Sequence, residues 1–88
     1  MSAMDDVIMK EVERWYGKRG LEVALMLKDF LQLYHGHSFE GLTENKCTEF
    51  LWDYYPLRVL NASERSHTLA ARVVYFILKF VEGSRDVV

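Results

Sequence analysis

Apolar residues recur every three or four positions along nearly the whole chain, a spacing that is typical of amphipathic α-helices. Near the N-terminus they stand at positions 4, 8, 12 and 15, and a denser row with similar spacing runs over residues 23–34. No window alternates apolar and polar residues for long enough to build a sheet. The sequence therefore predicts an all-α fold.

Residues that end helices divide this pattern into segments. Gly17 and Gly20 both suit the left-handed position that follows a helix, so the first helix is expected to end near them. The polar stretch His-Gly-His-Ser, residues 35–38, ends the second helix. The second helix is the most apolar, which indicates a central position in contact with more than one neighbour.

Two further helices are expected in the second half of the chain. Thr43 suits the N-cap of the third helix, and Pro56 disfavours helical geometry at Tyr55, where that helix is expected to end. Asn61, with Glu64 three residues later, resembles a capping box that starts the fourth helix. A chain of 88 residues supports one core. We therefore expect one domain over residues 1–88, a compact four-helix bundle with helices near 3–17, 21–35, 43–55 and 62–82.

The segment FLWDYYPLRV, residues 50–59, holds more aromatic residues than one inward helical face needs. Positions 47, 50, 51 and 54 already form that face at helical spacing. Trp52 and Tyr55 lie away from it, because each residue of an α-helix turns the chain by about 100°. Tyr75 and Leu78 lie off the main apolar stripe of the fourth helix in the same way.

This surplus of apolar side chains predicts a contact surface, because contiguous exposed apolar area usually marks an interface. The expected interface residues are Trp52, Tyr55, Tyr75 and Leu78. The alternative is that the tyrosines lie half-buried at the edge of the core with their hydroxyls in water. We expect a non-catalytic protein–protein interaction module that self-associates, with a homodimer or another protein as its partner.

A small nucleic-acid-associated regulator is the alternative function. Residues 56–88 carry five bases against three acids, whereas residues 21–55 carry six acids against two bases. The candidates for phosphate contacts are Arg58, Arg65, His67 and Arg72. The net charge of −2 disfavours this alternative, because nucleic-acid-binding domains usually carry a strong basic footprint.

Catalytic and metal-binding patterns are weak in this sequence. The soft-ligand candidates His35, His37, Cys47 and His67 lack the close paired spacing of zinc modules. Ser66 and His67 are neighbours on a helix and therefore point in different directions, which does not suit a nucleophile and its base. We expect no enzymatic activity and no cofactor.

The remaining signals concern location. Cys47 is the single cysteine, and the N-terminal residues lack the basic and then apolar pattern of a secretory signal. No apolar run is long enough to span a bilayer. We expect a cytoplasmic protein without a membrane partner.

Overall fold

The computed structural model describes residues 3–59 and 64–86, and within them all regular structure is helical, which confirms the all-α prediction. The elements are α1 (Ala3–His35), the 3-10 turn η1 (Phe39–Gly41), α2 (Glu44–Glu49), the π-helical turn η2 (Phe50–Tyr54), α3 (Tyr55–Arg58) and α4 (Glu64–Asp86). The expected cap at Asn61 lies outside the described residues.

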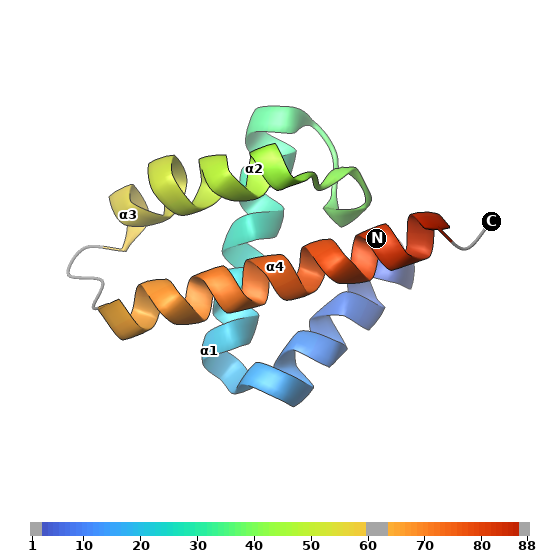
Figure 1. The fold of residues 1–88 in the computed structure, drawn as a ribbon, viewed down its shortest axis with the longest axis horizontal. Coiled ribbons are helices and arrows are strands. Elements are labelled where there is room, and N and C mark those ends of the chain that lie inside the picture. The colour runs from blue at the N-terminus through green and yellow to red at the C-terminus, as the bar shows by residue number, and fades with distance from the viewer. Residues whose placement is uncertain (1–2, 60–63, 87–88) are drawn as a thin grey trace.

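Helix α1 bends sharply at Gly17, whose backbone angles of φ 72° and ψ −163° are not helical. The bend separates a first arm, residues 3–16, from a second arm, residues 18–35, which diverge in Figure 1. The chain therefore needs no loop between the helices predicted at 3–17 and 21–35. The four-helix bundle is not confirmed: over the described ranges the helices form three bodies, namely bent α1, the run α2–η2–α3, and α4.

Side chains pack closely on both sides of the bend at Gly17. Gly20 is buried, and a Cβ there would overlap the Cβ of Tyr16, so only glycine fits without movement of that side chain. The Tyr16 ring packs edge-on against Phe76 of α4, with 5.6 Å between centroids. Trp15, expected to face the core, is exposed and donates a hydrogen bond to Glu11 instead. Tyr16 makes the inward contact at this end of the first arm.

The run α2–η2–α3 begins as predicted but ends later. The Thr43 side chain accepts a hydrogen bond from the Lys46 N–H, so Thr43 is the N-cap. The predicted end at Tyr55 is wrong, because the chain stays helical through Pro56 to Arg58. A π-turn makes this possible: the Tyr55 N–H donates to the Phe50 carbonyl, five residues back.

The π-turn suits a proline that follows it. In this register the Leu51 carbonyl would receive the N–H of residue 56, and proline has none. The His67 Nε2 atom of α4 lies 3.3 Å from that carbonyl and serves it as a donor. A side chain of α4 thus replaces the hydrogen bond that Pro56 removes.

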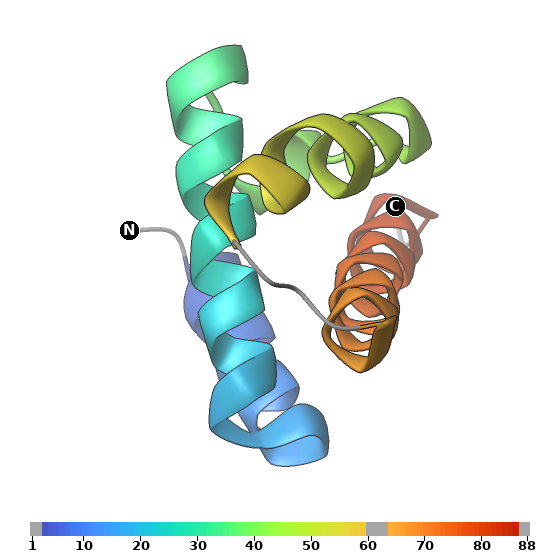
Figure 2. The same cartoon turned by 90° about the vertical axis from the view of Figure 1, so that its left-hand side faces the viewer.

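Helix α4 packs against several elements at once. It contacts both α1 and the α2–η2 run, and it crosses the second arm of α1 in Figure 1, whereas Figure 2 shows it nearly end-on beside them. Its buried sector is therefore wider than one stripe, and it consists of Ala70, Val73, Val74, Ile77, Leu78 and Val81.

Candidate functional site

The four predicted interface residues do not form one surface. Trp52 is 68% exposed and Tyr75 is also exposed, as expected. Tyr55 and Leu78 are only 4% and 6% exposed, so the expectation that they lie on the surface is wrong. Leu78 is buried because α4 is covered from more than one side.

Tyr55 is buried because of the π-turn. Counting at 100° per residue places it off the inward face, but the π-turn holds more residues than an α-turn and rotates Tyr55 inward. Its ring centroid lies 5.9 Å from that of Phe50, and its hydroxyl donates to the Ser66 carbonyl at 3.4 Å. Burial raises the pKa of the Tyr55 hydroxyl above its usual value.

A different apolar surface is exposed where the second arm of α1 meets η2 and α3. We call it the end patch and define it as Leu33, Tyr34, Tyr54 and Leu57. Leu57 is 79% exposed, and Leu33 and Tyr34 are also exposed. A hollow of about 220 Å³ opens here, with Phe30 among its lining residues, and a shallower one beside it shares Tyr54 and Arg58.

Aromatic contacts hold the end patch in place. The Tyr54 ring centroid lies 5.2 Å from that of buried Phe30 and 5.9 Å from that of Tyr34. The Arg58 guanidinium lies over the Tyr54 ring, 4.8 Å from its centroid, in a cation–π contact. Rings fixed in this way lose little side-chain entropy when a partner covers them.

Acidic residues surround the end patch. Asp29, Glu49 and Asp53 line the two hollows, and Asp29 and Asp53 are exposed. Of the described residues that line them, Arg58 is the one cation, and it is engaged over Tyr54. The end patch therefore combines an apolar centre with a predominantly negative rim.

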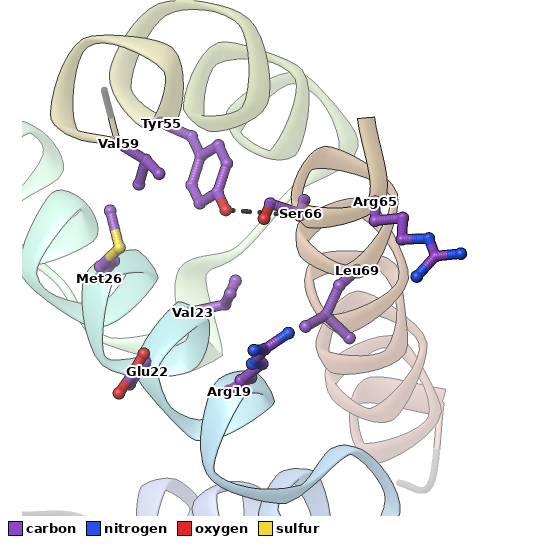
Figure 3. A pocket seen from close by; sticks show the side chains of 9 residues that line it. All are labelled: Arg19, Glu22, Val23, Met26, Tyr55, Val59, Arg65, Ser66 and Leu69. Carbon is purple, nitrogen blue, oxygen red and sulfur yellow. Dashed lines mark hydrogen bonds between the residues drawn. The ribbon is translucent and has the colours of Figure 1, made fainter. Parts of the chain in front are cut away.

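A larger hollow lies on the other side of α3, between α3, α4 and the second arm of α1. We call it the α4 cavity; it has a volume of about 450 Å³ and is shown in Figure 3. Apolar side chains from three elements converge on it, and the Tyr55 hydroxyl stands between them, directed at Ser66. Its lining residues are Arg19, Glu22, Val23, Met26, Tyr55, Val59, Arg65, Ser66 and Leu69.

The rim of the α4 cavity is mainly basic. Arg19 stands on α1 and Arg65 on α4, with Glu22 as the acid among the lining residues. An adjoining hollow shares Arg65 and Leu69 with the cavity and adds Thr68 and Arg72. Sequence reasoning missed Arg19; the available signal was the Lys-Arg pair at positions 18 and 19, just after the first glycine.

The predicted nucleic-acid residues are separated in the structure. Arg65 and Arg72 line one hollow together. Arg58 lies at the end patch, and His67 faces Leu51 and the Trp52 ring, 5.4 Å away between centroids. Of the four candidates for phosphate contacts, Arg65 and Arg72 therefore share a surface, whereas Arg58 and His67 make contacts with Tyr54 and with Leu51.

The histidines have structural partners and the cysteine is buried: His35 Nε2, for example, lies 3.5 Å from the Glu49 carboxylate. Lys46 Nζ donates to His37 Nε2 at 2.6 Å, which leaves Nδ1 to donate to the Ser38 carbonyl at 2.8 Å. Burial, with a smaller effect of Glu44, raises the pKa of the Cys47 thiol to about 12. A thiol of that kind is a poor nucleophile at neutral pH. In the part of the chain that the structure describes, no three His, Cys, Asp or Glu side chains gather as a metal site would require.

The comparisons with known proteins give no further guide. Neither a protein-family model, nor a curated protein, nor a solved structure matches this chain. Over residues 3–59 and 64–86, no helix has the length and apolar character needed to cross a bilayer.

Proposed function

We propose that this chain is a non-catalytic, cytoplasmic protein–protein interaction module that self-associates through the end patch. The exposure of Leu33, Tyr34 and Leu57 around two neighbouring hollows, which share Tyr54 and Arg58, is the observation that supports it. Apolar and aromatic side chains gathered in this way are typical of the centre of an interface, with polar residues at its rim. The end patch replaces the surface expected from the sequence, because Tyr55 and Leu78 of that expected surface are buried.

The composition of the end patch favours a protein partner. Tyrosine is enriched among residues that contribute most to binding, and Tyr34 and Tyr54 are already held against Phe30. The hollow of about 220 Å³ is smaller than typical small-molecule sites. A side chain from another protein suits a hollow of this size.

Molar mass across a range of protein concentrations tests the proposal, by size-exclusion chromatography with light scattering. We expect the mass of the wild-type chain to rise with concentration, and Leu57→Ser to reduce that rise. Leu25→Ser is the matched control, because Leu25 is an exposed leucine outside both hollows of the end patch. A monomer at every concentration, or equal behaviour of the two variants, would contradict the proposal.

Nucleic-acid binding is the second candidate, and the exposed face of α4 favours it. Arg65, Arg72 and Lys79 are exposed on this helix, with Tyr75 among them, and Arg19 of α1 lines the α4 cavity together with Arg65. Cations can neutralise phosphates, and an exposed tyrosine can stack on a base.

A labelled duplex titrated at several salt concentrations tests this second candidate. We expect binding that weakens with salt and is lost in the double variant Arg65→Glu/Arg72→Glu. The control is Lys10→Glu/Lys18→Glu, which reverses two exposed lysines of α1 outside the α4 cavity and its adjoining hollow. Equal loss in both double variants would contradict a site on α4.

A further inference from the structure

We propose that self-association is head-to-tail: the end patch of one copy docks into the α4 cavity of the next copy. This inference rests on the proposed function and adds the surface that the end patch recognises. The occupant of the α4 cavity is thus a second copy of this chain, with Leu57 as the inserted side chain.

Charge complementarity supports this pairing. The end patch has Asp29, Glu49 and Asp53 at its rim, whereas the α4 cavity and its adjoining hollow have arginines at positions 19, 65 and 72. Residues three or four apart are neighbours on a helix surface. Within residues 65–86 of α4, no acid has this spacing from Arg65 or Arg72. Complementary rims of this kind steer encounter and fix the orientation of the bound partners.

The apolar parts of the two surfaces also correspond. Leu57 is the most exposed large apolar side chain in the described residues, and two acids, Glu49 and Asp53, line the same hollow together with Arg58. Val23, Met26, Val59 and Leu69 give the α4 cavity an apolar lining inside its basic rim. A protruding leucine with a mainly acidic rim therefore meets an apolar hollow with a mainly basic rim.

One copy can offer both surfaces at the same time. Among the residues that the structure describes, none lines both the end patch hollows and the α4 cavity. Neighbours in sequence are divided between them: Tyr54 and Leu57 line the hollow of the end patch, whereas Tyr55 and Val59 line the α4 cavity. Contacts between two different surfaces form rings or open chains rather than closed pairs. A symmetric dimer of end patches would instead bring the acids of both copies together.

Charge reversal distinguishes the two arrangements. The acid-reversed variant is Asp29→Arg/Asp53→Arg, and the base-reversed variant is Arg65→Glu/Arg72→Glu. In the head-to-tail arrangement each variant faces a rim of its own sign, so we expect association of each alone to weaken roughly tenfold or more. Mixing the two variants pairs opposite rims again and restores a high mass by light scattering.

Controls keep the result specific to these surfaces. Asp6→Arg/Glu13→Arg reverses two exposed acids of the first arm, outside both surfaces, and is expected to associate like the wild type. Circular dichroism of each variant checks that it is folded. Association of the wild type should also weaken as salt rises from 50 to 500 mM, on the order of tenfold, because exposed charges are screened.

The outcomes separate this inference from the proposed function. A wild-type chain that is monomeric at all concentrations overturns both. A wild-type chain that associates, while the base-reversed variant associates equally well or the mixture stays monomeric, overturns the head-to-tail arrangement alone. Loss of association only in the acid-reversed variant would indicate a symmetric contact between end patches. This outcome also overturns the head-to-tail arrangement alone.

Discussion

Replacing Gly17 with alanine tests the bend in α1 most directly. Gly17 has φ 72° and ψ −163°, a conformation that side chains with a Cβ rarely adopt. A Cβ at this position would meet no atom within 4 Å, so a clash contributes nothing to the cost. The whole effect of Gly17→Ala therefore comes from the backbone.

The magnitude follows from the conformation. Forcing a non-glycine residue into such a region costs about 1–3 kcal/mol, so the free energy of unfolding should fall by that amount. Gly83 is the matched control, since it is helical and exposed and a Cβ there would also meet nothing within 4 Å. Gly83→Ala should raise the free energy of unfolding by about 0.5–1 kcal/mol, because alanine favours a regular helix.

Urea denaturation followed by circular dichroism measures both variants at a protein concentration where the chain is monomeric. Replacing glycine with alanine is expected to lower the free energy of unfolding at position 17 and to raise it at position 83. In thermal unfolding, a loss of 1 kcal/mol in a domain of this size lowers Tm by roughly 4–8 °C. If Gly17→Ala stabilises the chain as much as Gly83→Ala, residues 3–35 form a straight helix in solution and the bend is refuted.

Three further predictions concern His67 and Cys47. His67→Ala should lower the free energy of unfolding by about 1 kcal/mol. The loss should be smaller in a Pro56→Ala background, because alanine at position 56 has an N–H that can donate to the Leu51 carbonyl in place of His67. Additive effects of the two substitutions on the free energy of unfolding would contradict this role of His67. Cys47 should react with a thiol reagent only as fast as the chain unfolds, and fast labelling of the native chain would show it to be accessible. The Cys47 thiol has a pKa of about 12 in the folded chain against 9.0 unperturbed, so as pH rises it ionises in the unfolded chain first. The free energy of unfolding should therefore fall as pH rises from 9 towards 12, and this fall should be smaller in Cys47→Ala.

Local sequence signals predicted the elements that depend on local chemistry. The Thr43 side chain caps α2, and α1 ends at His35, where Gly36 has a φ of 69°. Apolar spacing also identified the buried residues Ile8, Val12 and Leu27. These features follow from contacts within a few residues, which a single sequence displays.

The features that the sequence did not predict depend on contacts between distant elements. Helical counting assumes a constant turn, so one π-turn after position 49 changes the inward face and buries Tyr55. The partner that makes the turn favourable, His67, lies sixteen residues from Leu51 along the chain. The basic rim of the α4 cavity likewise combines Arg19 with Arg65, which only the packing of α1 against α4 brings together.

The π-turn also determines both proposed interaction surfaces. The π-turn directs Tyr55 toward Ser66 and the α4 cavity. It leaves Tyr54 between Phe30 and Arg58 at the end patch. A regular α-turn over the same residues would rotate both tyrosines away from these positions. The proline that looked like the end of a helix is compatible with this turn, because the hydrogen bond it cannot make is supplied by His67. A local backbone irregularity of this kind therefore links the packing of α4 to the surface on which self-association is proposed to depend.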